Sequence, residues 1–219
     1  MTGGTMYMLM FRRPDSETPQ EFGERLRMVG EKLAAEPTAT TVILHVQDER
    51  TGAPAGASFE DRDFDAGLTV DGVGADVLPD ADALYAVSRR IIKSRKRPVA
   101  GTRTPGFTIV CPSNRAAFLT HAQFDAHWRD NHSKIHVASS PGTCNYEQFT
   151  VDEILTPGAP AADGFGWLSF DSAESWETEL FDGERGQRAI LEDVDRFLDP
   201  SRFATFGCSE YVYRDAATI

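Results

Sequence analysis

Residues Thr120-His121-Ala122-Gln123-Phe124 open a predicted helix and echo an earlier stretch of the chain, Thr18-Pro19-Gln20-Glu21-Phe22. The offset is constant, because 120 − 18 and 124 − 22 both equal 102. A pattern that recurs after about a hundred residues indicates two copies of one supersecondary unit. We therefore predict two domains, a degenerate repeat over 1–98 and a second repeat over 107–219 that carries the functional site.

The apolar segments predict the same order of elements in both copies. Strands are expected at 6–11, 40–47, 64–70, 84–92, 107–111, 143–151, 165–170 and 210–214. A capped helix follows the first strand of each copy. The second copy adds a helical pattern over 172–197, where the first copy has only a loop near 72–81. Each copy thus reads β-α-β-β-α-β, the ferredoxin-like order, with the second helix of the first copy reduced. We predict an α+β fold in which two tandem ferredoxin-like sheets close into one intramolecular barrel.

The composition argues against two classes of binding partner. A net charge of −12 over 219 residues argues against nucleic acid and against anionic membrane surfaces, because both attract basic proteins. No apolar run approaches the length of a membrane span, and the three cysteines show neither metal-ligand spacing nor a disulfide framework. These features predict a cytoplasmic location. The basic run at 93–97 is expected to be a solvated linker.

Only the second copy carries a chemically suggestive helix. Phe124, Trp128 and His132 are spaced by four and share one helix face, whereas the first copy has Leu26 and Gly30 where the second has Trp128 and His132. A histidine at the end of an apolar stripe can be a pocket residue, a core residue or a cation at the helix C-terminus. We expect no metal site, because the nearby histidines have no marked partner ligands.

Four segments in order carry a resemblance to a known family. They are Phe124-x3-Trp128-x3-His132, Tyr146-x-Gln148, Asp163-Gly164-Phe165-Gly166-Trp167-Leu168-Ser169-Phe170 and Phe197-Leu198-Asp199-Pro200-Ser201-Arg202. As an ordered set they resemble the EthD domain family, although Ser133-Lys134-Ile135 replaces the usual turn after the histidine. The resemblance implies a dimeric α+β barrel. It also implies cofactor-free chemistry on aromatic or polyketide-like molecules, by dehydratases, decarboxylases, cyclases or oxygenases.

The resemblance places His132 in an apolar pocket, where a neutral imidazole is suited to general acid/base work. Tyr146 is the second candidate catalytic residue. The candidate substrate-binding residues are Trp128, Gln148, Phe124, Trp167, His45 (the first-copy counterpart of Gln148) and Arg89. Packing roles for the tryptophans and for Tyr146, and an exposed edge position for Arg89, remain alternatives. The acidic residues of the last helical region, Asp193 among them, are assigned to caps and polar helix faces.

Three hypotheses for function follow. The first is a cofactor-independent lyase or isomerase, of dehydratase or decarboxylase type, acting on an aromatic or phenolic small molecule through His132. The second is a cofactor-free oxygenase of an activated phenol or anthrone. The third is a non-catalytic binding or accessory protein of a catabolic pathway. No nucleotide-binding fingerprint is present, so no cofactor is expected, and a haem role is the weakest reading. A homodimer is an open possibility, because small domains of this order tend to pair.

Overall fold

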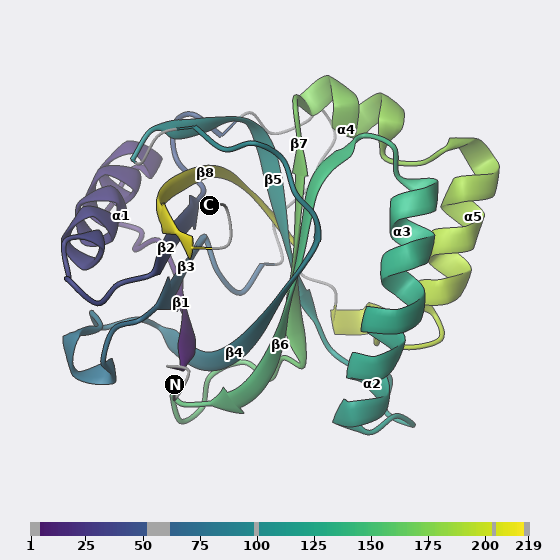
Figure 1. The fold of residues 1–219 in the computed structure, drawn as a ribbon, viewed down its shortest axis with the longest axis horizontal. Coiled ribbons are helices and arrows are strands. Elements are labelled where there is room, and N and C mark those ends of the chain that lie inside the picture. Colours follow the sequence, from purple (N-terminus) through teal and green to yellow (C-terminus); the bar gives the residue numbers. More distant parts are fainter. Residues whose placement is uncertain (1–4, 52–61, 99–100, 203–204, 217–219) are drawn as a thin grey trace.

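The computed structural model describes residues 5–51, 62–98, 101–202 and 205–216. Eight antiparallel strands form a closed barrel in the order β1-β3-β2-β8-β5-β7-β6-β4 (Figure 1). The first half contributes β1 (Met6–Phe11), α1 (Pro19–Ala34), β2 (Thr41–Val46), β3 (Ala66–Asp71), the short 3-10 helix η1 (Ala75–Val77) and β4 (Ala83–Lys93). The second half contributes β5 (Arg103–Ser113), α2 (His121–His127), the π-helical turn η2 (Trp128–His132), α3 (Ser133–Ser139), β6 (Thr143–Ile154), β7 (Gly164–Phe170), α4 (Ala173–Glu179), α5 (Gly183–Val194), the 3-10 turn η3 (Pro200–Arg202) and β8 (Phe206–Asp215).

The two halves of the barrel have matching strand order. Around the barrel the first half runs β4-β1-β3-β2 and the second runs β8-β5-β7-β6, so each places its strands in the order fourth, first, third, second. The α+β barrel is therefore confirmed. The tandem repeat and the boundaries 1–98 and 107–219 stay predictions. Within the described residues, no helix is both long enough and apolar enough to cross a membrane.

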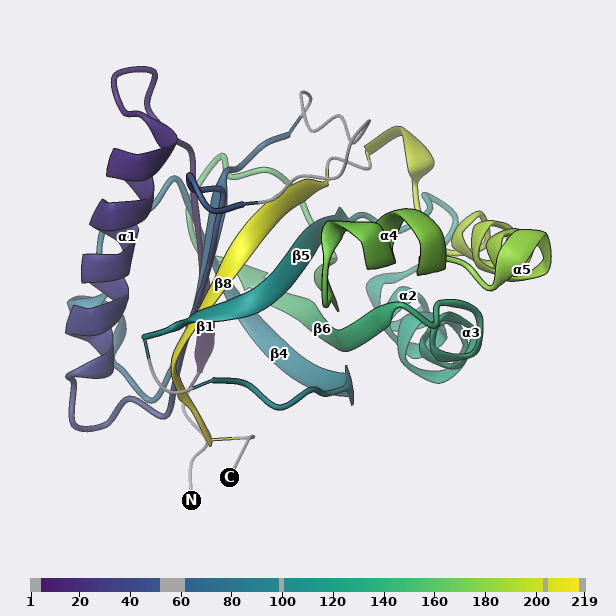
Figure 2. The same cartoon turned by 90° about the horizontal axis from the view of Figure 1, so that it is seen from above.

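Helices cover the outside of the barrel on two opposite sides. Helix α1 lies against the first half, and α2 to α5 lie across the barrel from it (Figures 1 and 2). Both predicted helix starts are confirmed, because Thr18 and Thr120 each form a reciprocal capping box, with Glu21 and Gln123 respectively. The second helix does not end at its histidine, as the sequence suggested. Instead it widens into a π turn over Trp128–His132 and continues as α3.

Helix α1 packs tightly on its half of the barrel. A Cβ added to Gly30 would lie 2.5 Å from the ring of Tyr213, so the helix approaches β8 there as closely as a glycine permits. Leu26 is fully buried one turn earlier. Gly30 lies 102 residues before His132, and the ring of Tyr213 occupies the space beside it.

The barrel interior is apolar over much of its length and charged in one region. Its apolar cluster includes Met10, Phe149 and Trp167. The charged region consists of buried ion pairs that join Arg89, Arg95 and Arg97 to Glu147, Glu210 and Asp215. The prediction that the run 93–97 is solvated is wrong for its two arginines, since the side chains of Arg95 and Arg97 are only 11% and 5% exposed. Their acidic partners lie far away in the chain, which no local pattern reveals.

Candidate active site

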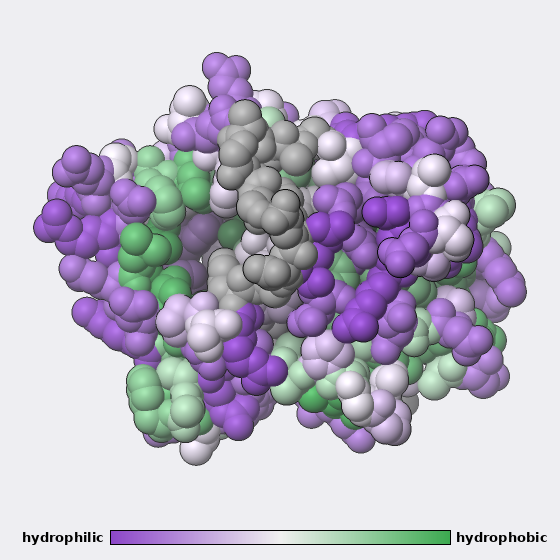
Figure 3. All heavy atoms as spheres, turned by 180° about the vertical axis from the view of Figure 1, so that it is seen from behind, coloured by the Kyte–Doolittle hydropathy of each residue, from purple (hydrophilic) through white to green (hydrophobic). Residues whose placement is uncertain are grey.

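A cavity of about 380 Å³ lies in the second half, between the outer face of the barrel and the helical segments η2, α3, α4 and α5. Strand alternation turns the outward-facing side chains of β5, β6 and β7 toward it. Its described lining is mainly apolar and includes Cys111, Trp128, His132, His136, Tyr146, Leu168, Trp176, Ile190, Asp195 and Phe197. In the view from behind, the surface is mostly hydrophilic, and apolar side chains reach it on the side of these helices (Figure 3).

His132 is held by an acid on a different helix. Its Nδ1 lies 2.9 Å from Oδ2 of Asp193, and Nε2 of His127 lies 2.9 Å from the other carboxylate oxygen. Burial raises the pKa of Asp193, but the hydrogen bonds from His132 and His127 outweigh it and hold the pKa below its usual value. The ionised carboxylate therefore accepts the Nδ1 proton of His132, which leaves Nε2 as the basic nitrogen.

Tyr146 supplies a hydroxyl to the same cavity. Its oxygen accepts hydrogen bonds from Nε1 of Trp128 at 3.0 Å and from Nε2 of Gln148 at 2.9 Å. Burial raises the pKa of Tyr146 above its ordinary value, so the phenol keeps its proton. With two donors already on the oxygen, that proton is available to a ligand.

His136 lies one helical turn beyond His132 and also lines the cavity. Its Nε2 is 3.1 Å from Oγ1 of Thr143, and its ring lies 4.7 Å from that of Tyr146. Burial, with a smaller contribution from the neighbouring His132 and Lys93, lowers the pKa of His136 to about 3. The residue is therefore a neutral part of the wall.

Three of the eight predicted site residues line the cavity together: His132, Tyr146 and Trp128. Gln148 lies directly behind Tyr146, fully buried. Phe124 packs against Trp128 and Phe197, outside the cavity lining. Gly164, on β7, makes room for this arrangement, because a Cβ there would lie 2.4 Å from the Trp128 ring.

The other three predicted residues lie inside the barrel. Trp167 is on the inward face of β7 and packs on His45, with ring centroids 3.9 Å apart. His45 is fully buried, with Nε2 3.1 Å from Glu210, and burial lowers its pKa. Arg89 is not at an exposed edge, because its side chain is 6% exposed and pairs with Glu147 and Asp215. None of the three contributes to the described cavity lining.

The sequence reasoning missed Asp193 as a site residue. Helix α5 carries its side chain to His132, 61 residues earlier in the chain, and the residue is only 1% exposed. The assignment of Asp193 to a polar helix face is therefore wrong. Its neighbours Glu192 and Asp195 are also acidic but exposed. The hydrophobic pattern of the sequence therefore gave no sign that Asp193 alone is buried. The spacing of four residues between His132 and His136 could have predicted that both lie on the same helix face.

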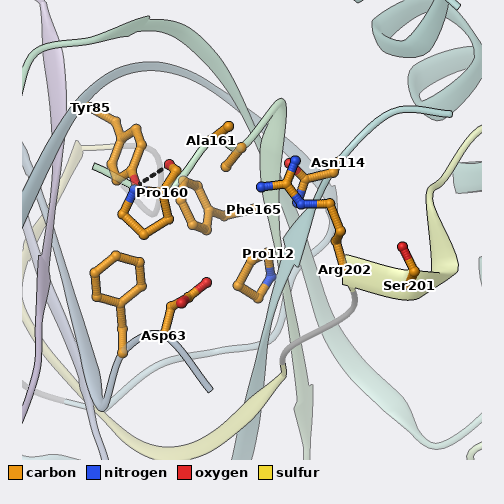
Figure 4. A pocket seen from close by; sticks show the side chains of 11 residues that line it. Asp63, Tyr85, Pro112, Asn114, Pro160, Ala161, Phe165, Ser201 and Arg202 are labelled. Carbon is orange, nitrogen blue, oxygen red and sulfur yellow. Dashed lines mark hydrogen bonds between the residues drawn. The ribbon is translucent and has the colours of Figure 1, made fainter. Parts of the chain in front are cut away.

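A second pocket of about 270 Å³ opens near one end of the barrel (Figure 4). Tyr85, Phe165 and Pro112 surround it, and Arg202 lies across from them. The Tyr85 hydroxyl donates to the carbonyl oxygen of Pro160 at 2.8 Å. No histidine lines this pocket among the described residues, and its carboxylate, Asp63, is half exposed and lies 3.9 Å from Arg12. Nor do the described residues include a group of three or more His, Cys, Asp and Glu side chains placed to hold a metal ion.

Comparisons with known proteins establish the fold. No protein-family profile and no curated protein sequence matches the chain. An anthrone oxidase-like protein of known structure is similar over 98% of this chain and 94% of its own, with a TM-score of 0.54 and 12% sequence identity. A protein described as a candidate chlorite dismutase aligns over 99% of this chain and 98% of its own, with a TM-score of 0.47 and 9% identity. At such identity the first likeness shows a shared overall fold and nothing more.

Proposed function

We propose that this protein is a cofactor-independent enzyme that moves protons on a neutral aromatic or phenolic molecule, as a lyase or isomerase. The observation that carries the proposal is the contact of 2.9 Å between His132 and Asp193 at the wall of a largely apolar cavity. A buried carboxylate that fixes the tautomer of an imidazole is the recurrent means of preparing a general base. The four ordered segments that resemble the EthD family support membership of that family and agree with this role.

The chemistry can be written for the loss of water from a β-hydroxy carbonyl compound. Nε2 of His132 takes a proton from the carbon beside the carbonyl, and Tyr146 donates a hydrogen bond to the carbonyl oxygen, on which negative charge builds. The electron pair of the C–H bond becomes the new C=C bond as the C–O bond breaks. The leaving hydroxyl takes the proton back from His132 and departs as water, so the enzyme is unchanged. Isomerisation begins with the same proton transfer.

The cavity lining indicates a neutral substrate. Among the described lining residues there is no lysine or arginine, and the acid Asp195 is part of the wall. An anionic group would therefore enter a low-dielectric space without a counter-charge. The aromatic rings of Trp128, Trp176 and Phe197 suit a planar molecule with its polar group near His132 and Tyr146.

The test is turnover of a panel of neutral phenols and β-hydroxy aryl ketones by the unaltered protein and by His132→Gln. We expect loss of turnover of about a hundredfold or more in the variant, since a positioned base contributes on that order. The matched control is His121→Gln, because the half-buried His121 binds Asp163 and lies outside the cavity lining. Equal rates for the protein and His132→Gln would remove His132 from the role of base.

A cofactor-free oxygenase is the second candidate, favoured by the likeness to an anthrone oxidase-like protein. His132 would deprotonate an anthrone or phenol, and O₂ would oxidise a ring methylene to a carbonyl, with its second oxygen leaving as water. An oxygen electrode separates the two candidates. Turnover that is unaffected by strict anaerobiosis supports the lyase or isomerase, and uptake of one O₂ per product supports the oxygenase. Stoichiometric binding without product would point to a binding protein instead.

A further inference from the structure

One cation of the first half contacts a residue that lies directly behind the candidate active site. Arg90, on β4, is the cross-strand neighbour of Gln148 on β6, and both side chains point outward toward the helices. Its Nε donates to Oε1 of Gln148 at 3.2 Å. Its terminal nitrogens bind Asp125 at 2.6 Å and Thr150 at 2.8 Å, and the guanidinium lies 6.0 Å from the ring of Trp128.

These contacts determine the orientation of the Gln148 carboxamide. Arginine only donates hydrogen bonds, so the Gln148 atom facing Arg90 has to be the oxygen. The backbone oxygen of Trp128 only accepts, so the atom facing it, at 3.1 Å, has to be the nitrogen. The same nitrogen is 2.9 Å from the Tyr146 hydroxyl. The two fixed neighbours therefore leave one orientation, in which Gln148 donates to Tyr146.

We infer that Arg90 is a positioning residue for the proposed reaction, acting through Gln148 to turn the hydroxyl proton of Tyr146 into the cavity. Without Arg90, only the Trp128 carbonyl would oppose rotation of Gln148, and a rotated Gln148 would offer its oxygen to Tyr146. The hydroxyl would then donate to Gln148 and would be lost to the substrate. The ion pair with Asp125 and the hydrogen bond with Thr150 hold Arg90 in place. This inference rests on the proposed function for the use of the hydroxyl, but not for the orientation of Gln148.

Two measurements test the inference on Arg90→Met and Arg90→Lys. The first, in the ligand-free protein, is the solvent exchange rate of the Gln148 side-chain amide protons by NMR. We expect exchange about tenfold faster in both variants, as loss of one hydrogen bond to a charged group predicts. The matched control is Arg129→Met, because Arg129 also pairs with Asp125, at 3.1 Å, but is not among the described hydrogen-bond partners of Gln148. Unchanged exchange in both Arg90 variants overturns the inference, whatever the protein binds.

The second measurement is the apparent pKa of bound 4-nitrophenol, a coloured probe of hydrogen-bond donation to a phenolate. Arg90→Met and Tyr146→Phe should each raise it by about one unit, which is a tenfold change. Adding Arg90→Met to Tyr146→Phe should give no further shift, because the effect passes through the hydroxyl. A full further shift would show direct electrostatics from Arg90 and would overturn the relay.

The two failures are distinguishable. If the unaltered protein does not bind 4-nitrophenol, the phenolic substrate class of the proposed function fails. Faster amide exchange in the Arg90 variants, but not in Arg129→Met, would still support the control of Gln148 by Arg90. Conversely, tight 4-nitrophenol binding with no change on altering Arg90 leaves the proposed function standing and removes Arg90 from it.

Discussion

Asp193 and His132 lie on two different helices and meet with 2.9 Å between Oδ2 and Nδ1. Both side chains are buried, and the carboxylate has a second histidine on its other oxygen. The acid therefore cannot turn away without breaking both contacts. Asp193 therefore holds His132 in one tautomer, and His127 and His132 are its two partners among the described ion pairs.

Replacing Asp193 by asparagine should remove activity while the fold survives. The amide of Asp193→Asn can donate to Nδ1 of His132, which would move the imidazole proton to Nε2 and leave no base facing the cavity. We expect turnover to fall about a hundredfold or more. Glu192→Gln on the exposed side of the same helix is the control. Steady-state kinetics, with circular dichroism to confirm folding, make the comparison, and matching rates in the two variants would dismiss Asp193 from the site.

Removing the hydroxyl of Tyr146 should weaken both turnover and stability. Tyr146→Phe loses the proposed donor and leaves the buried N–H groups of Trp128 and Gln148 without this acceptor. We expect a loss of about 1–3 kcal/mol in the free energy of unfolding. Turnover in the folded fraction should fall about tenfold or more. Tyr85→Phe also removes one buried hydroxyl contact, but away from the cavity. A similar fall in turnover for both variants would speak against a specific role of Tyr146.

The neutral His136 should make the protein sensitive to mild acid. Its pKa is about 3 in the folded protein against an ordinary value of 6.5, so the unfolded chain binds the extra proton as the pH falls. The stabilisation is fully present above pH 6.5 and is lost as the pH falls from there toward 3. Between pH 7 and pH 5 the loss from this group is about 2 kcal/mol.

Urea unfolding of the protein and of His136→Gln at both pH values measures this contribution. The variant should lose about 2 kcal/mol less than the protein over the same interval. Some pH dependence should persist in the variant, because burial also lowers the pKa of His45. Identical losses in the two proteins would mean that His136 is not buried as a neutral group.

The two halves should respond differently to equivalent truncations. Trp128→Ala and Leu26→Ala fall 102 positions apart and both remove a buried side chain, so each should cost about 2–5 kcal/mol of stability. Only Trp128 lines the cavity and holds the Tyr146 hydroxyl. Ligand binding per folded molecule should therefore weaken only in Trp128→Ala. If both variants lose binding merely in proportion to unfolded protein, the site does not belong to the second half.

Local signals in the sequence were sufficient for the elements and for part of the site. The capping residues Thr18 and Thr120 act within three residues of themselves, so both helix starts could be predicted. The spacing of Trp128 and His132 placed both on the cavity side of one helix. Such signals operate over one or two turns and are independent of the rest of the fold.

The other parts of the fold and of the candidate site could not be predicted locally, because they depend on contacts between segments far apart in the sequence. Both faces of β7 are apolar, so alternation could not show that Trp167 points into the barrel rather than toward the helices. The partner of His132 is 61 residues away in sequence. Arg97, which reads as a solvated linker residue, is buried because acids from β6 and β8 face it. The closure of the barrel creates each of these environments.

The charged region inside the barrel affects which halves of the chain can pair to close a barrel. Its three cations, Arg89, Arg95 and Arg97, all precede residue 99, and their partners Glu147, Glu210 and Asp215 all follow residue 101. Two copies of the first half would bring arginine against arginine, and two copies of the second would bring acid against acid, both costly when buried. The buried charges therefore disfavour pairing of two like halves and favour pairing of a first half with a second half.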